Sequence, residues 1–203
     1  MKLLFLSFLI FFSTLSYADD DYSVRFFVGA ASASDLDELY TFQGLNRSPY
    51  ETNVVGFDLG YRLYEDIFTL PFDLYIKGGV SYFDENGYQA DFLELVTFFK
   101  LIYKLDIFDN QIRLGFGEGW SYAGRVPYRE AQEAIRENDN QSKFLNYLDI
   151  SFDFDVGKLF RVKSLEHLYF GYLIKHRSGF HGVYNGVADG GSNYNSLYLE
   201  KNF

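Results

Sequence analysis

Eight segments of this chain alternate apolar and polar residues with a period of two. Successive side chains of a strand point to opposite faces, so this alternation predicts eight β-strands that each carry one apolar face. The segments are residues 22–30, 52–64, 72–83, 92–105, 111–122, 145–155, 167–178 and 192–203. The opposite faces carry charges such as Arg25, Asp58 and Asp149. The pattern therefore favours an all-β fold with one apolar and one charged surface.

The connections between these segments also alternate. Those after the second, fourth and sixth segments are comparatively short: 65–71, 107–110 and 156–166. Those after the first, fifth and seventh are long and polar: 31–51, 123–144 and 179–191. Only 84–91 departs from this pattern, because it is short. Short turns on one side and long loops on the other are typical of outer-membrane barrels. We therefore predict an eight-stranded antiparallel transmembrane β-barrel in the bacterial outer membrane, with its apolar faces toward lipid.

Inward-facing side chains just fill an eight-stranded barrel. We expect ten charged residues to pair inside it: Arg25, Asp58, Arg62, Asp73, Lys77, Glu94, Lys100, Arg113, Asp149 and Asp153. The alternative is a soluble periplasmic sandwich or lipocalin-like barrel, which would turn the apolar faces inward. The aromatic fraction of 21%, the terminal Phe203 and the asymmetry of the loops favour the membrane instead.

Residues 1–18 have the features of a secretory signal peptide. Lys2 supplies a positive charge, Leu3–Phe12 is apolar except for Ser7, and Ser16-Tyr17-Ala18 provides a small-residue cleavage site. Residues 19–203 then form a single barrel domain. Within its fifth connection, Pro127–Asn138 predicts a short surface helix, because proline is favoured at a helix start.

Composition limits the chemistry that this chain can perform. It has no cysteine, which excludes disulfides and thiolate metal sites, and its net charge of −10 argues against nucleic acid as a partner. No cluster of His, Asp and Glu has the spacing of metal ligands, and no glycine-rich phosphate loop precedes a helix. We therefore expect neither a metal nor another cofactor.

The seventh segment carries the candidate catalytic residues. Its even-numbered positions are apolar from Leu168 to Ile174 and then become His176 and Ser178. A serine hydroxyl is a weak nucleophile until a base removes its proton, and a histidine two residues away on the same face is such a base. Gly179 and Gly182 follow in the next loop, where a backbone N–H is able to stabilise an oxyanion.

This part of the chain resembles the PagL-type lipid A 3-O-deacylases, which are eight-stranded outer-membrane esterases. Their signature is His-x-Ser near the end of strand seven, a loop with Asn and Gly, and an acidic residue that opens strand eight. This sequence has His176-Arg177-Ser178, then Gly179-Phe180-His181-Gly182, and then Asp189-Gly190-Gly191-Ser192-Asn193. The architectural likeness covers the whole mature chain, whereas the match of residues is confined to about the last 30 positions.

The third member of the catalytic group departs from that family. The family's acid falls at Asn193 or Ser192, and neither residue is acidic. Asparagine can orient an imidazole by accepting its N–H, as in Cys-His-Asn enzymes. Asp189 is the nearest carboxylate. Glu118 is a further candidate, because it interrupts an apolar face and would be linked to His176 through Asn146.

The resemblance implies a serine esterase that removes an ester-linked acyl chain from lipid A, with lipopolysaccharide of the outer leaflet as its partner. The alternative function is non-enzymatic, either as an adhesin or as a membrane-stabilising protein, because eight-stranded barrels host both. The long loops would then be the functional parts. The sequence leaves open which acyl chain is removed and whether the barrel forms a homodimer.

Overall fold

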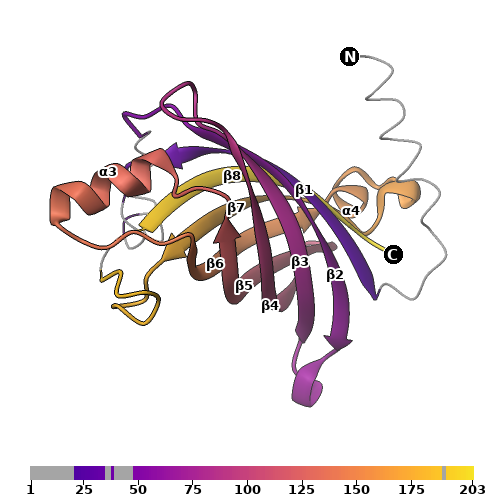
Figure 1. Ribbon diagram of the computed structural model, residues 1–203. Coiled ribbons are helices and arrows are strands. Elements are labelled where there is room, and N and C mark those ends of the chain that lie inside the picture. Colours follow the sequence, from indigo (N-terminus) through magenta and orange to yellow (C-terminus); the bar gives the residue numbers. More distant parts are fainter. Residues whose placement is uncertain (1–20, 35–37, 39–47, 189–190) are drawn as a thin grey trace.

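Eight antiparallel strands pair in chain order, and the first pairs with the last to close a barrel, as the computed structural model shows (Figure 1). The structure describes residues 21–34, 38, 48–188 and 191–203. The strands are β1 (Tyr22–Ser32), β2 (Asn53–Tyr64), β3 (Phe72–Asp84), β4 (Phe92–Ile107), β5 (Asn110–Ala123), β6 (Phe144–Asp155), β7 (Leu168–Ser178) and β8 (Gly191–Asn202). Each lies close to its predicted bounds. The predicted fold class is confirmed.

Apolar side chains cover the outside of the barrel, and polar side chains fill the inside. On β2, Val55 and Leu59 are more than half exposed, whereas Asp58 between them is 1% exposed. The register of each strand pair is continuous except for one shift between Arg62 and Tyr64, so this division holds along the barrel. An apolar exterior with a polar interior is the arrangement of a transmembrane barrel. The protein is therefore a barrel of the outer-membrane type, and the soluble alternative with apolar faces inward is excluded.

Ion pairs occupy the barrel interior. Arg25 Nε donates to Asp58 at 2.8 Å, and the same guanidinium bonds Asp149. Lys100 Nζ donates to Asp149 at 2.8 Å, and Lys77 Nζ lies 3.1 Å from Asp58. The remaining predicted residues pair as Arg62–Asp73, Arg113–Asp153 and Glu94–Lys175. All ten predicted charges are therefore paired, which closes the interior with side chains.

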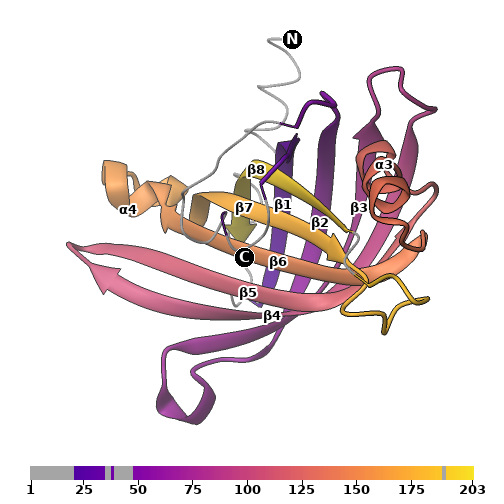
Figure 2. The same cartoon turned by 90° about the vertical axis from the view of Figure 1, so that its left-hand side faces the viewer.

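The two ends of the barrel carry different connections (Figures 1 and 2). The helix α3 (Tyr128–Glu137) lies at the end with the long loops and confirms the predicted surface helix. The opposite end carries η1 (Ile67–Thr69), α4 (Val156–Phe160) and η2 (Lys163–Leu165). The sequence did not predict α4. It begins where the Asp155 side chain accepts a hydrogen bond from the backbone N–H of Lys158 at 2.9 Å, which caps the helix.

No helix in the described part of the chain is long and apolar enough to span a bilayer. The predicted signal peptide, 1–18, lies outside the described residues.

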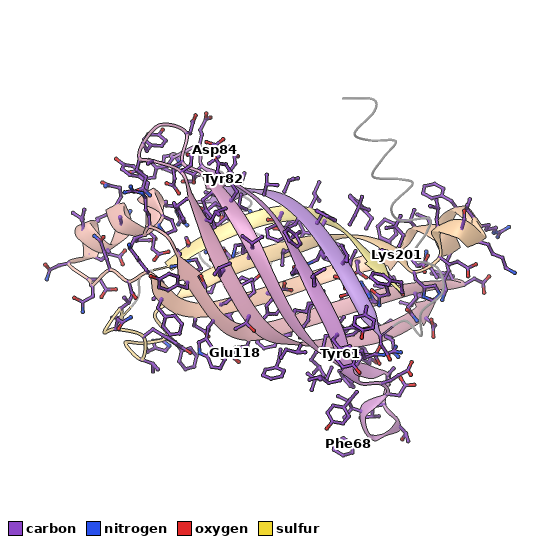
Figure 3. The ribbon with its side chains drawn as sticks, turned by 45° about the vertical axis from the view of Figure 1, so that its right-hand side comes forward. Tyr61, Phe68, Tyr82, Asp84, Glu118 and Lys201 are labelled. Carbon is purple, nitrogen blue, oxygen red and sulfur yellow. The ribbon has the colours of Figure 1, made fainter. Side chains whose placement is uncertain are left out.

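Aromatic side chains gather at the end of the barrel that is opposite α3. Phe68, at the tip of the connection between β2 and β3, is 90% exposed and extends away from the barrel near Tyr61 (Figure 3). Phe108, in the turn between β4 and β5, is 99% exposed. Aromatic residues of membrane proteins are enriched where the bilayer meets water. We therefore assign this end to one interface of the membrane.

Asp149 provides a direct test of the charged interior. Its replacement in Asp149→Ala leaves Arg25 and Lys100 without their shared carboxylate, which we expect to destabilise the barrel by about 3–5 kcal/mol. Unfolding in urea, followed by the heat-modifiable migration of the detergent-solubilised barrel, measures this loss. Asp106→Ala is the control, because this aspartate is exposed at the end of β4 and should shift stability by about 0.5 kcal/mol at most. Equal stability of the two variants would contradict the prediction.

Candidate active site

His176 and Ser178 lie on the outside of β7, at the end of the barrel that carries α3. The residues between and beside them, Lys175 and Arg177, point inward and are 1% exposed. The strand register places His176 between Leu148 of β6 and Asn193 of β8. Leu148, His176 and Asn193 therefore form one row across β6, β7 and β8. The side chain of His176 has a direct cross-strand neighbour on each side.

Asn193 is hydrogen-bonded to His176. The distance from Asn193 Oδ1 to His176 Nδ1 is 2.6 Å. The other end of the amide, Nδ2, donates to the carbonyl oxygen of Ser34 at 3.0 Å. Since a carbonyl only accepts, the amide nitrogen must face Ser34 and the amide oxygen must face the imidazole. Nδ1 of His176 therefore carries the proton, and Nε2 is left as the basic nitrogen.

Asn146 is the cross-strand neighbour of Ser178 on β6. It points outward, yet only 2% of its surface is exposed. Its Nδ2 is buried and has no hydrogen-bond partner in the described part of the chain. A buried donor without a partner costs free energy unless something else supplies the acceptor. The amide N–H groups of Asn146 are thus available as hydrogen-bond donors on the strand next to Ser178.

The loop after Ser178 packs closely against its own other end. A Cβ at Gly179 would lie 2.0 Å from the carbonyl oxygen of Val187, so only glycine fits at this position. Gly182 has a φ of 87°, which also favours glycine. Asp139, just after α3, accepts from the backbone of Ala188 at 3.0 Å and fastens the loop to its neighbour. The side chain of Ser178 itself makes no hydrogen bond with another described residue.

One of the predicted residues stands apart from this group. Glu118 lies on the outside of β5, as Figure 3 shows, in the same row as His176. Leu148 lies between them, so Glu118 makes no contact with the imidazole. Asp189 lies outside the described residues. The structure therefore places Ser178, His176, Asn193 and Asn146 at outward positions of neighbouring strands, and it joins only His176 and Asn193 by a hydrogen bond among the described residues.

Sequence reasoning missed the contacts that hold α3 over this site. Glu130 Oε2 accepts from Arg177 Nε at 3.2 Å and from the Ser192 hydroxyl at 3.1 Å. Arg177 also donates to Glu94 at 3.2 Å and bonds Ser121. The available signal was the odd-numbered position of Arg177, which puts this charge on the face opposite His176 and Ser178.

Glu130 is fully enclosed, and this affects its ionisation. Burial raises the pKa of the Glu130 carboxyl above its ordinary value of 4.5, although Arg177 opposes the shift. The folded protein then holds this proton more tightly than the unfolded chain does. Protonation of Glu130 therefore contributes stability that is fully present below about pH 4.5 and declines as the pH rises through the raised pKa.

An apolar groove runs along the outside of the barrel below this site. It has a volume of about 410 Å³ and crosses β3 to β7. Ile150 and Ile174 line its upper part. They are paired with each other and lie one outward position before Leu148 and His176. The groove therefore begins where the polar site ends.

No group of His, Cys, Asp and Glu in the described part of the chain is arranged to hold a metal ion.

No protein-family model and no curated protein sequence matches this chain. The fold is similar to that in the crystal structure of the outer membrane enzyme PagL, with a TM-score of 0.57 and 13% sequence identity. That alignment covers 89% of this chain and 99% of the other. Neisserial surface protein A (NspA) aligns with a TM-score of 0.49 and 15% identity, over 90% of this chain and 97% of the other. The likeness to PagL establishes the barrel fold.

We expect Glu130→Ala to release α3 from the barrel. The loss of a hydrogen bond to the charged Arg177 should cost about 2 kcal/mol, which raises the detached population about thirtyfold. Trypsin cleavage after Arg129 and Arg136 reports this detachment. Glu137→Ala is the control, because its ion pair with Arg136 is on the surface and should leave cleavage unchanged. Equal cleavage rates for the two variants would show that Glu130 does not anchor the helix.

Proposed function

We propose that this protein is an outer-membrane serine esterase that removes an ester-linked acyl chain from lipid A. Ser178 is the nucleophile, His176 is its general base and Asn193 orients the imidazole. The observation that carries this proposal is the 2.6 Å hydrogen bond that His176 Nδ1 donates to Asn193 Oδ1, which leaves Nε2 as the basic nitrogen on the face that Ser178 shares.

The reaction follows from this arrangement. Nε2 of His176 takes the proton of the Ser178 hydroxyl while Oγ attacks the carbonyl carbon of the ester. The tetrahedral intermediate collapses as the imidazolium returns the proton to the departing sugar oxygen, which leaves the acyl group on Ser178. Water, deprotonated by the same imidazole, then releases the fatty acid. Asn193 keeps the imidazole in the required tautomer throughout.

The oxyanion needs hydrogen-bond donors beside Ser178. The buried Nδ2 of Asn146 has no partner in the described part of the chain and supports a role as one donor. The backbone N–H of Gly179 is the further candidate, whereas that of Gly182 already donates to the carbonyl oxygen of Val187 at 2.8 Å. Asn146 comes from the strand next to Ser178, so its position depends on the barrel rather than on a loop.

The surroundings of the site support a lipid as the substrate. His176 and Ser178 share the outward face with Ile174, which lines the apolar groove of about 410 Å³. A molecule in the outer leaflet reaches this face laterally, with an acyl chain along the groove and its ester at Ser178. The PagL resemblance of the sequence specifies lipid A among such molecules.

One observation favours the non-enzymatic alternative, in which the loops bind a partner. The loop after β7 is fastened to the segment after α3, since Asn140 Nδ2 donates to Gly186 at 3.0 Å and Asn185 Nδ2 donates to Ser142 at 2.7 Å. A firmly held rim suits an adhesin or a membrane-stabilising protein. Unchanged lipid A in cells that make folded protein would favour this alternative.

Ser178→Ala and His176→Ala should each reduce deacylation by about a thousandfold or more, because each removes a reacting group. Asn193→Ala should reduce kcat by about a hundredfold, because the imidazole loses its orientation. Mass spectrometry of lipid A incubated with the purified barrel measures these rates. Ser164→Ala and His181→Ala are matched controls at exposed positions and should retain full activity. Activity that survives in Ser178→Ala would exclude the mechanism.

Asn146→Leu should lower kcat by about 10²–10³ with little change in KM, because an oxyanion donor acts mainly in the transition state. The fold should tolerate leucine, since the amide nitrogen has no partner among the described residues. Asn195→Leu is the control. It removes an outward amide that accepts from Tyr172 at 2.7 Å, and it should leave kcat unchanged. A normal kcat in Asn146→Leu would assign the oxyanion to the loop backbone alone.

A further inference from the structure

A second cavity lies above the candidate active site, beside α3. It has a volume of about 560 Å³ and is lined by Ala33, Tyr50, Arg129, Gln132, Glu133 and Arg136, together with Pro49 and Ile135. Unlike the apolar groove, it has polar or charged side chains at half of its lining positions. Two arginines against one glutamate make its charged lining positive, although the chain as a whole has a net charge of −10.

Arg129 is the unusual residue of this cavity. Only 8% of its surface is exposed, and its Nη1 is buried without a hydrogen-bond partner in the described part of the chain. Its nearest carboxylate is Glu133, 3.8 Å from Nη2, and Glu133 also pairs with Arg136 at 3.4 Å. A buried guanidinium with an unused N–H is costly on its own, and a bound anion would remove that cost.

The cavity adjoins the proposed esterase site. Ala33, in its wall, precedes Ser34, whose carbonyl oxygen accepts from Asn193. Arg129 lies in the first turn of α3. The next residue, Glu130, is bonded to Arg177 and Ser192, which fixes α3 against β7 and β8. The hydrogen bonds of Glu130 therefore fix the position of Arg129 relative to β7, the strand of His176.

From the middle of the barrel toward the end that carries α3, the order is thus an apolar groove, then His176 and Ser178, and then a positive cavity. An outer-leaflet amphiphile has the same order, with acyl chains in the membrane, an ester above them and a charged headgroup at the surface. We infer that the cavity beside α3 binds a phosphate group of the amphiphilic substrate, with Arg129 as its principal ligand. This inference deepens the proposed function, and it relies on that function for the position of the ester.

Binding is tested separately from catalysis in the Ser178→Ala barrel, which keeps the cavity but should not turn over. The only tryptophan of the chain, Trp120, lies on the outside beside Asn146 and supplies a fluorescence signal near the site. The probes are lipid A with both phosphates, the same lipid after enzymatic dephosphorylation, dioleoyl phosphatidate, and inorganic phosphate alone. Arg129→Met is the test variant, and Arg125→Met, at an exposed arginine before α3, is its matched control.

Arg129→Met should weaken binding of the phosphorylated lipids by about tenfold or more, because it removes charge-assisted hydrogen bonds. Binding of dephosphorylated lipid A should be equally weak with and without Arg129, and Arg125→Met should bind like the parent. Phosphatidate binding as tight as that of lipid A would assign the cavity to phosphate on any outer-leaflet lipid, which still supports the inference. If inorganic phosphate alone binds as tightly as the phosphorylated lipids, the inference is overturned, because the cavity would then bind the free anion and not the headgroup of a lipid.

Equal affinity of Arg129→Met and Arg125→Met for phosphorylated lipid would also overturn the inference. Retained heat-modifiable migration of Arg129→Met shows that the barrel is folded in this comparison. The proposed function fails by a different result, namely no deacylation by the barrel with Ser178 in place. The two failures are therefore distinguishable, because the first is seen in binding and the second in turnover.

Discussion

The absence of water from the bilayer core is the constraint on which this structure depends. Every backbone N–H and C=O in that region must find a partner within the protein, which a sheet achieves only by closing on itself. The pairing of β1 with β8 provides this closure over ten residue pairs, from Ser23 with Asn202 to Ser32 with Asn193. The last of these pairs also holds Asn193, so the closure that satisfies the backbone positions the partner of His176.

Closure also explains why the interior is charged. An inward side chain in an eight-stranded barrel meets those of several other strands, so a buried charge there can be satisfied from more than one side. Arg25 and Lys100 share Asp149. Nearer α3, Glu94 pairs with Lys175 and Arg177, and Arg177 also pairs with Glu130 of α3. Ion pairs of the interior therefore also hold the helix beside the site.

The sequence predicted the strands well because lipid imposes a strict rule on each residue. A strand in a bilayer must alternate, and its parity assigns His176 and Ser178 to the outside without any knowledge of their neighbours. The interior ion pairs followed from the same parity. Cross-strand register is a different kind of information, because it depends on which residues meet after closure. For that reason Leu148, between Glu118 and His176, could not be foreseen, whereas the hydrogen bond of Asn193 to His176 agrees with the position assigned to it by resemblance.

Asparagine in place of a carboxylate has a chemical consequence for the proposed reaction. A carboxylate both orients the imidazole and stabilises the positive charge that forms on it, whereas a neutral amide oxygen does only the first of these well. The imidazolium beside Asn193 must then be stabilised elsewhere or remain less favourable.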